Sequence, residues 1–394
     1  MKLLDLFFKK GYSKHPDSVI ISCYFNPTGS KYRKKVFDQY YETIKHLDHR
    51  IIECIIGDGP SELTQVKNLE IVRTDHVLWH KESLLNKLIF SLPEKYKYVF
   101  WIDADVIFSN KNWLVDGCKE LETYQVVQPF EYCVHLDKDQ VEPDSGTRLF
   151  LENEFAWTSP KQASKYKIWR SFGANVITNP QYARNNDYDI HGHVGFAWGA
   201  RLDYLKSIGG LFDKALVGGA DHIMAHAFIG QIPCECITKS FGDLREIEDW
   251  SKSAFYNTGG SILSGISYAQ GNLYHLWHGD IEKRQYLKRI QEFQPKVNQI
   301  QHRDDNGLFV TDDDSYVRDY FIFREVTDHI SSLDGISIAD LPGSTDSLFT
   351  SEQPYENQDV DPGQFEGGQF EGGQFGGSGA GADWDDNVVT ENFS

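Results

Sequence analysis

The sequence predicts an α/β fold built around a parallel sheet, and two observations carry that prediction. In the first third of the 394-residue chain, apolar runs of strand length alternate with stretches whose apolar residues recur every three or four positions. One of these runs passes directly into Asp103-Ala104-Asp105. Strands separated by helices favour parallel pairing, which places ligand-binding side chains at the carboxyl ends of the strands.

The elements of this first third follow in order. Strands are predicted over residues 19–25, 51–56, 69–73, 98–102 and 125–130. A helix with one apolar face is predicted around residues 37–47. A second helix is predicted over residues 82–92, where leucines and an isoleucine repeat at three and four, and Pro93 ends it.

The rest of the chain is less regular. Residues 135–190 are rich in Asp, Asn, Ser and Pro and are predicted to be loop. A short strand is predicted over residues 194–198, and helices over 202–208 and 220–230. Residues 280–330 are predicted to be mostly helical, because apolar side chains recur there at three and four.

The tail from residue 334 differs in composition from the body. It holds 13 acidic residues and no Lys or Arg, which leaves a net charge of −6 for residues 1–333 out of −19 for the whole chain. Residues 363–377 repeat a Gly-Gln-Phe unit, and glycine at this density predicts a flexible tail. The alternative is an adaptor whose Phe365, Phe370 and Phe375 contact a protein partner.

Composition and charge exclude several classes of protein. With 40% apolar residues the chain is neither wholly disordered nor a small disulfide-stapled fold. No apolar run approaches the ~18 residues of a membrane span. The acidic body shows no overall nucleic-acid footprint. Basic residues do gather locally, and solvated helix faces are the expectation for them: Lys161, Lys165, Lys167 and Arg170, then Lys283, Arg284, Lys288, Arg289, Lys296 and Arg303.

The cysteines and the first residues point to the cytoplasm. All six cysteines are expected to be reduced. Cys234-x-Cys236 lacks the two-residue spacing of a zinc knuckle or redox pair. Residues 1–10 are too short and too charged for a secretory signal.

Histidines gather in two further places. His222 and His226 lie four apart without the glutamate of a zinc-protease helix, so buried or capping roles are expected. The stretch His191-Gly192-His193 is expected to be a polar loop.

Three motifs carry candidate chemistry. Asp103 and Asp105 follow a buried strand, and oxygen ligands so placed suit Mg²⁺ or Mn²⁺ bridging to diphosphate oxygens. His278, followed by a glycine, is placed to complete the metal shell. Asp221 opens a predicted helix after two glycines and is either a cap or an acid–base group.

The ordered set of motifs resembles the nucleotide-sugar glycosyltransferases of the GT-A fold over residues 18–325. The motifs are Trp79-His80-Lys81-Glu82-Ser83-Leu84-Leu85-Asn86, Asp103-Ala104-Asp105, Phe196-Ala197-Trp198-Gly199-Ala200-Arg201, Gly209-Gly210-Leu211-Phe212-Asp213, Gly219-Ala220-Asp221 and His275-Leu276-Trp277-His278-Gly279. The nearest resemblance is to phage and bacterial members related to the base J glucosyltransferase, some of which modify hydroxymethylated DNA bases. It implies a Rossmann-like mixed sheet flanked by helices, a catalytic domain over 1–333 and a helical extension over 281–333.

Within that domain, the resemblance implies a nucleotide-sugar-binding half at about 18–135 and an acceptor half at 136–280. It implies a UDP-sugar donor, and that Phe25, Asn26 and Glu53 face the nucleoside. Lys81 and Asn86 would reach the ribose or diphosphate, and Trp198, Gly199 and Ala200 would line the donor sugar. Asp103, Asp105 and His278 would hold the divalent ion.

Asp221 would deprotonate the attacking hydroxyl in an inverting enzyme, or orient sugar hydroxyls in a retaining one. Many inverting relatives have two acids where this chain has Ala220-Asp221. The base is therefore less firmly implied than the metal ligands.

Several functions stay open at this level. The acceptor is either a glycan, lipid-linked sugar or protein, or a hydroxymethylated DNA base, the latter in a phage-encoded enzyme of the host cytoplasm. The alternative is a protein that is not an enzyme. It would be a catalytically silent module that binds a sugar nucleotide or a glycan and recruits partners through its tail. A nucleotidyltransferase also uses paired acids, but residues 25–30 match its basic glycine-rich phosphate loop poorly.

Overall fold

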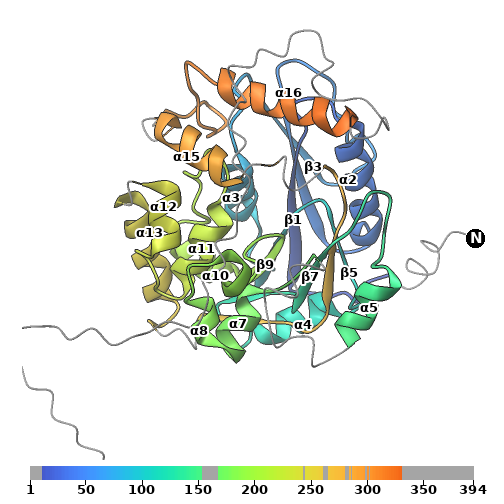
Figure 1. The fold of residues 1–394 in the computed structure, drawn as a ribbon, viewed down its shortest axis with the longest axis vertical. Coiled ribbons are helices and arrows are strands. Elements are labelled where there is room, and N and C mark those ends of the chain that lie inside the picture. Colours follow the sequence, from blue (N-terminus) through green and yellow to red (C-terminus); the bar gives the residue numbers. More distant parts are fainter. Residues whose placement is uncertain are drawn as a thin grey trace, which may run out of the picture. The chain divides into compact units, whose positions relative to one another are not determined.

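The protein is described from a computed structural model (Figure 1). The structure describes residues 11–152, 167–242, 245–260, 265–279, 284, 286–297, 300 and 302–330. The chain divides into two units, residues 1–340 and 341–394. All described residues belong to the first unit, so the predicted flexible tail lies outside them.

A seven-stranded mixed sheet forms the centre of this unit. Its strand order is β10-β6-β9-β4-β1-β2-β3. All neighbours pair in parallel except β9, which runs antiparallel to both β4 and β6. The strands are β1 (Ser18–Phe25), β2 (His49–Ile56), β3 (Leu69–Thr74), β4 (Tyr98–Ile102), β6 (Val126–Gln128), β9 (Ala197–Arg201) and β10 (Ile266–Tyr268).

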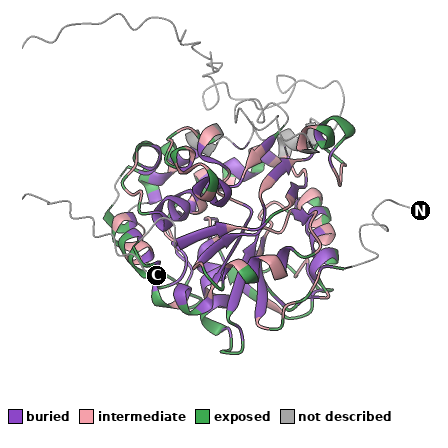
Figure 2. Ribbon diagram, turned by 90° about the horizontal axis from the view of Figure 1, so that it is seen from below, coloured by how far each residue is buried: buried purple, intermediate pink, exposed green. Residues whose placement is uncertain are grey.

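Alternating side chains of this sheet enter two separate apolar cores. On β1, Val19 and Ile21 pack into a core with α3 (Lys81–Ser91), whereas Ile20 packs into a second core with α2 (Lys31–Ile44). This follows from the two-residue period of a strand. Figure 2 shows the result, buried strands in the centre with the exposed residues on the outer helices.

A second, four-stranded sheet has the order β5-β11-β7-β8. Its strands are β5 (Val106–Phe108), β7 (Tyr132–His135), β8 (Ile168–Arg170) and β11 (Asn272–His275). β5 begins directly after Asp105, and β11 pairs with it antiparallel so that His275 lies opposite Val106. The backbone N–H of Leu276 donates to the carbonyl of Asp105 at 2.8 Å. This sheet therefore brings the C-terminal histidines to the Asp103–Asp105 loop.

The remaining helices surround the two sheets. They are α4 (Trp113–Glu120), α5 (Ser145–Glu152), α7 (Phe172–Thr178), α8 (Pro180–Ala183), α9 (Tyr188–His191), α10 (Leu202–Ser207), α11 (Ala220–Phe228), α12 (Glu235–Phe241), α13 (Arg245–Asn257), α15 (Tyr286–Val297) and α16 (Ser315–Ile330). α16 crosses the top of Figure 1, and its Phe321 packs on Phe25 at the end of β1. None of the described helices has both the length and the apolar character that a bilayer crossing requires.

The predicted α/β class, with a mixed sheet flanked by helices and helices at the C-terminal end of the body, is confirmed. Two expectations differ from the structure. Residues 135–190 were expected to be loop but contain one strand and several short helices. One of them is α7, which Ser171 caps by accepting a hydrogen bond on Oγ from the N–H of Ala174. This helix forms because it buries Phe172 and Val176. The strand expected over 194–198 begins at Ala197, because Phe196 has a φ of +79°, which no extended strand adopts.

Candidate active site

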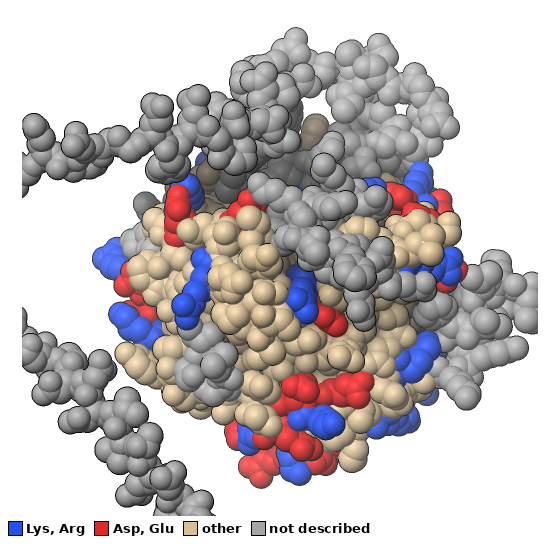
Figure 3. All heavy atoms as spheres, turned by 60° about the horizontal axis from the view of Figure 1, so that its bottom comes forward, with Lys and Arg blue, Asp and Glu red and all other residues tan. Residues whose placement is uncertain are grey.

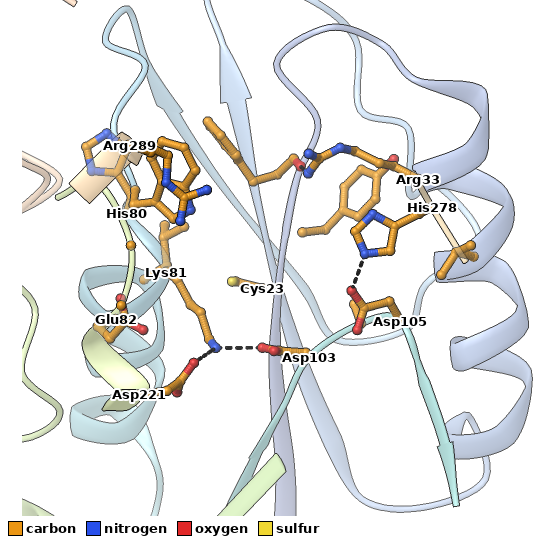
Figure 4. A pocket seen from close by; sticks show the side chains of 18 residues that line it. Cys23, Arg33, His80, Lys81, Glu82, Asp103, Asp105, Asp221, His278 and Arg289 are labelled. Carbon is orange, nitrogen blue, oxygen red and sulfur yellow. Dashed lines mark hydrogen bonds and ion pairs between the residues drawn. The ribbon is translucent and has the colours of Figure 1, made fainter. Parts of the chain in front are cut away.

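A pocket of about 290 Å³ opens where β1 and β4 end, beneath α15 and α16 (Figure 4). Two groups of charged side chains face each other across it. Lys81, Asp103 and Asp221 form one group, and Asp105 and His278 form the other. The lining residues are Cys23, Tyr24, Phe25, Arg33, Val36, Trp79, His80, Lys81, Glu82, Leu84, Asp103, Ala104, Asp105, Gly218, Gly219, Asp221, His278 and Arg289.

Lys81 joins two carboxylates that are distant in sequence. It is the first residue of α3, and its Nζ lies 2.6 Å from Oδ1 of Asp103 and 3.0 Å from Oδ2 of Asp221. Burial opposes its charge, but Asp103 and Asp221 raise the pKa of Lys81 well above its usual range. The second oxygen of Asp221, Oδ1, is buried and has no hydrogen-bond partner among the described residues. Buried carboxylate oxygens without a partner are rare, so Asp221 is a candidate functional residue.

Two carboxyl groups beside Lys81 hold their protons unusually tightly. Burial raises the pKa of Asp103 to about 7, helped by the neighbouring carboxylates and opposed by Lys81. Burial raises the pKa of Glu82 to about 8, again with Lys81 opposing. Perturbed carboxyl groups that gather in one pocket are typical of functional sites.

Asp105 and two histidines form the opposite side of the pocket. Oδ2 of Asp105 lies 2.8 Å from Nε2 of His278 and 3.6 Å from Nε2 of His275. Burial, with Arg284 nearby, holds the pKa of His278 well below its usual range, so the ring is neutral. Nη2 of Arg324 lies 3.0 Å from Nδ1 of His278, and Nη2 of Arg284 lies 3.1 Å from its Nε2, so each ring nitrogen faces a guanidinium donor.

This side fits a divalent ion. One ligand atom each from Asp105, His275 and His278 lies within 4.8 Å of the others. The second carboxylate oxygen, Asp105 Oδ1, is buried without a hydrogen-bond partner among the described residues. Carboxylate oxygens suit Mn²⁺ or Mg²⁺, and the imidazole nitrogens favour a transition metal such as Mn²⁺ over Mg²⁺.

Two arginines add positive charge that the sequence did not single out as part of the site. Arg33 lines the pocket from α2, its guanidinium lies 5.5 Å from the Phe321 ring centre, and it makes no ion pair with a described residue. Burial lowers the pKa of Arg33. Arg289 lies over the Trp79 ring at 4.3 Å and donates to the hydroxyl of Tyr320 at 3.1 Å. Fixed guanidinium groups of this kind match phosphate oxygens.

The turn before β9 reaches the same place. The carbonyl of Phe196 accepts from the N–H of Asp103 at 2.7 Å, and the Phe196 ring stacks on His193 at 4.1 Å. Gly195 lies beside Asp221, because a Cβ added there would be 3.8 Å from Oδ2. A positive φ at a phenylalanine is uncommon and marks a position that its surroundings hold in place. The sequence carried no signal for this turn beyond its glycine.

Three of the residues expected at the donor sugar are not brought to the pocket. Trp198, Gly199 and Ala200 lie in the middle of the sheet on β9. Trp198 is 1% exposed and stacks on Trp101, and an added Cβ at Gly199 would clash with the Phe100 ring at 2.4 Å. These residues face cores because β9 pairs on both sides.

Asn86 and Glu53 have structural partners. Asn86 donates to the carbonyl of Leu211 at 2.9 Å and accepts from its N–H at 2.7 Å, so it bridges α3 to the Gly210–Leu211 turn. Glu53 is 2% exposed and accepts from the hydroxyl of Ser61 and the N–H of Glu62. Neither lines the pocket.

Phe25 and Asn26, expected at the nucleoside, are placed differently from one another. Phe25 lines the pocket and meets Phe321 of α16 edge to face at 5.7 Å. Asn26 accepts from the N–H of Ser30 and donates to Glu62, so its amide holds the turn after β1.

Comparisons with known proteins give the following results. No family model matches the chain, and no curated protein matches it. Among solved structures, glucosyl-3-phosphoglycerate synthase from Mycobacterium tuberculosis, in complex with Mn²⁺, UDP-glucose and phosphoglyceric acid, is similar at 10% identity with a TM-score of 0.35, over 75% of this chain and 81% of that one.

Two other structures illustrate the range of similar proteins. A mutant of Drosophila β-1,4-galactosyltransferase 7 with manganese, UDP-Gal and xylobiose shares 9% identity with a TM-score of 0.32, over 77% of this chain and 98% of that one. The 4-diphosphocytidyl-2C-methyl-D-erythritol synthase of Anaerococcus prevotii shares 11% identity with a TM-score of 0.29, over 74% and 97%. Similarities this low carry no argument about function, which has to come from the site.

Proposed function

We propose that the protein is a metal-dependent glycosyltransferase of the GT-A type, which moves a sugar from a nucleotide-sugar donor, with UDP-sugar favoured, to a hydroxyl acceptor. One observation carries the proposal. The pocket at the carboxyl ends of β1 and β4 holds the Asp105–His278 pair, and Asp221 lies opposite it. Asp105 and Asp221 each have one carboxylate oxygen without a hydrogen-bond partner among the described residues. The oxygen of Asp105 suits a metal ion that binds the diphosphate, and the oxygen of Asp221 suits a general base.

Asp105 and His278 would hold the ion, and Asp103 is the further carboxylate on the same loop. Oδ1 of Asp103 is held by Lys81, so an ion would compete with Lys81 for it. The bound ion supplies positive charge that stabilises the leaving nucleoside diphosphate. Arg33 and Arg289, which line the same pocket, would bind the diphosphate oxygens that face away from the ion.

The nucleoside would lie toward α16. Phe25 and Trp79 line the pocket there, and the Trp79 ring stacks on Phe321 at 4.8 Å. Because Arg289 and Phe321 already cover the Trp79 ring, Phe25 is the proposed surface for the planar base.

Asp221 is the proposed base. The acceptor oxygen attacks the anomeric carbon, the bond from that carbon to the phosphate oxygen breaks, and the nucleoside diphosphate leaves with the electron pair. The hydroxyl proton passes to Oδ1 of Asp221, while Oδ2 stays on Lys81 at 3.0 Å and is held in place. This describes inversion at the anomeric carbon; in a retaining enzyme Asp221 would instead orient the sugar hydroxyls.

The acceptor would enter past the turn before β9, where Gly195 and Phe196 lie beside Asp221 and Asp103. A glycan and a hydroxymethylated DNA base both present a hydroxyl of the required kind. On the bottom face of the molecule, which Figure 3 turns forward, described Lys and Arg residues are interspersed with Asp and Glu. That face lies away from α16 and the pocket, so the choice between a glycan and a DNA acceptor rests on the transfer assay below.

The deciding experiment measures hydrolysis of UDP- and GDP-sugars by the full chain with and without Mn²⁺, then transfer to oligosaccharides and to hydroxymethylated DNA. Mn²⁺-dependent release of UDP from one UDP-sugar, lost in Asp105→Asn, is expected. The matched control is Asp116→Asn, an aspartate on α4 outside the pocket lining. Donor binding without any release of diphosphate would instead indicate a silent binding module.

A further inference from the structure

Three buried histidines meet at α9 and α11, outside the pocket lining. His191 ends α9, and His222 and His226 lie on α11. Their exposed fractions are 0%, 2% and 0%, and one ring nitrogen of each lies within 4.8 Å of the others. Burying three imidazoles this closely is unfavourable unless their polar atoms are satisfied.

The hydrogen bonds of two of these rings fix their tautomers. Nδ1 of His191 lies 2.7 Å from the carbonyl oxygen of Gly192, which can only accept, so Nδ1 carries the hydrogen. Nδ1 of His226 lies 3.2 Å from Oε1 of Gln231, whose Nε2 donates to the carbonyl of Arg184 at 2.8 Å. That second bond fixes the amide orientation. In both rings the hydrogen is therefore on Nδ1, and Nε2 carries a lone pair that can bind a metal ion.

His222 follows the same pattern. Its Nδ1 lies 2.5 Å from the hydroxyl of Tyr188, and its Nε2 is buried with no hydrogen-bond partner among the described residues. Nε2 of His191 is buried and unpartnered in the same way. All three rings thus place Nδ1 beside an oxygen atom, and Nε2 of His226 lies beside Cys236. Hydrogen bonds to the other ring nitrogen are how a second shell orients metal-binding histidines.

A pair of cysteines at the start of α12 adjoins the histidines. Sγ of Cys236 lies 3.6 Å from Nε2 of His226, and Sγ of Cys234 lies 3.4 Å from Sγ of Cys236. His226, Cys234 and Cys236 form a second group of ligand atoms within 4.8 Å of one another. The thiolate is the form of cysteine that binds a metal ion, and either member of this pair lies close enough to His226 to share one with it.

We infer that this cluster binds one structural zinc ion, through the imidazoles of His191, His222 and His226 and a thiolate of the Cys234–Cys236 pair. Zinc prefers four nitrogen and sulfur ligands in a tetrahedron, with bonds of about 2.0–2.3 Å. The ligand atoms of such a site lie about 3.3–3.8 Å apart, so the atoms within each group would have to approach by up to about 1.5 Å. The two groups share only His226, so a thiolate would also have to move toward His191 and His222. The two unpartnered Nε2 atoms are the observation that points to an ion.

This site differs in chemistry and position from the Asp105–His278 site. Its donors are nitrogen and sulfur and its ligands are buried apart from the partly buried Cys234, whereas the pocket adds carboxylate oxygens and opens to solvent. The zinc would join α9, α11 and α12. His222 directly follows Asp221, so the ion would fix the helix that carries the proposed base.

The first test measures metal content on the full chain. Protein produced in zinc-supplemented medium and then passed through a desalting column should carry about one zinc per chain by plasma mass spectrometry. Asp105→Asn should keep that zinc, which separates this site from the pocket. A wild-type zinc content near zero, after production with zinc and after refolding in its presence, overturns the inference whatever the variants do.

The second test uses variants with a matched control. His222→Gln, and Cys234→Ser with Cys236→Ser together, should reduce the zinc content at least about tenfold. Cys118→Ser, a buried cysteine on α4, should leave the zinc content unchanged. Unchanged zinc in the folded histidine and double cysteine variants, with folding checked by circular dichroism, would show that the metal binds elsewhere.

A third measurement identifies the ligands directly. The cobalt(II)-substituted chain should show the visible bands of a tetrahedral ion and a thiolate-to-cobalt charge-transfer band that the double cysteine variant lacks. Thiol titration tests the alternative that Cys234 and Cys236 form a disulfide with one another. Two fewer free thiols in the metal-free native protein than in its reduced, unfolded form, together with no zinc, would mean that the pair forms a disulfide instead of holding a metal.

Discussion

Nε2 of His278 lies 2.8 Å from Oδ2 of Asp105, whereas Nε2 of His275, three residues earlier, lies 3.6 Å from the same oxygen. The two rings also differ in their surroundings. His275 is 2% exposed, and its ring stacks on Phe196 at 4.7 Å, while His278 lines the pocket. His278 is therefore placed to bind an ion together with a donor, and His275 is placed to pack behind it.

His278→Ala should raise the Mn²⁺ concentration required for half-maximal activity by about tenfold or more, because a lost nitrogen ligand is partly replaced by adding metal. His275→Ala is the matched control, and it should shift the Mn²⁺ requirement less while lowering thermal stability. Activity measured against Mn²⁺ concentration decides between them. A larger shift in His275→Ala would mean that the ligand has been assigned to the wrong histidine.

Asp221→Asn should reduce kcat for transfer by about 10²–10⁴-fold, the usual contribution of a general base, with little change in donor KM. The amide oxygen of Asn can still accept from Lys81, so the pocket should keep its shape. Asp213→Asn, whose carboxylate pairs with Arg303 at 2.9 Å outside the pocket lining, is the control. Steady-state assays of transfer across pH measure this effect. A near-normal kcat in Asp221→Asn would exclude Asp221 as the base.

Asn86→Ala should destabilise the protein by about 2–4 kcal/mol, because two buried backbone groups of Leu211 lose their partners. Urea denaturation measures this. The resemblance placed Asn86 at the donor, which predicts instead a raised donor KM in a chain of normal stability. Asn257→Ala, at the end of α13 on the protein surface, is the control.

Glu82→Gln should change how stability depends on pH. The folded carboxyl binds its proton more tightly than the unfolded one, so this residue stabilises the wild type at low pH and loses that contribution as pH rises toward about 8. Glu82→Gln, which stays neutral, should gain stability relative to wild type between pH 5 and pH 9. Urea denaturation at pH 5, 7 and 9 tests this, with Glu94→Gln at an exposed position as control. A stability difference that stays constant with pH would contradict the assigned cause.

Deleting residues 344–394 should leave activity on a small acceptor unchanged. The segment is dominated by Gly, Gln and acids and offers no periodic apolar face to a core. Activity and melting temperature of the truncated chain test this. A large drop in melting temperature would show that the segment docks on the body.

Much of the donor side of the pocket could be predicted from the sequence. β4 is an uninterrupted apolar run and β1 and β2 are mostly apolar, so their positions and their parallel pairing were predictable, and Asp103 and Asp105 came with β4. These are local signals, in which each strand or helix reveals its own type through neighbouring residues. Lys81 was implied by the resemblance to known motifs, which placed it at the ribose or diphosphate, whereas its Nζ contacts Asp103 and Asp221.

The acceptor side was less predictable, because long-range pairing decides it. The middle of β9 looks like a site from its Trp and Gly, but pairing on both sides buries it. The turn at Phe196 is set by contacts with His193 and Asp103, and the Lys81–Asp221 ion pair joins residues on different helices. The cluster of His191, His222, His226 and the two cysteines was passed over because its spacing matches no local zinc motif.

The two sheets are both completed by the C-terminal part of the described chain. Ile266 of β10 pairs with Val126 of β6, and Leu273 of β11 pairs with Phe108 of β5. During synthesis, β5 and β6 therefore emerge from the ribosome long before the strands that cover their edges. Pairings between such distant segments form slowly and leave strand edges exposed to aggregation in the meantime. Chains truncated before residue 265 should consequently be found mostly with chaperones or in inclusion bodies, even though the strands around Asp103 would already be present.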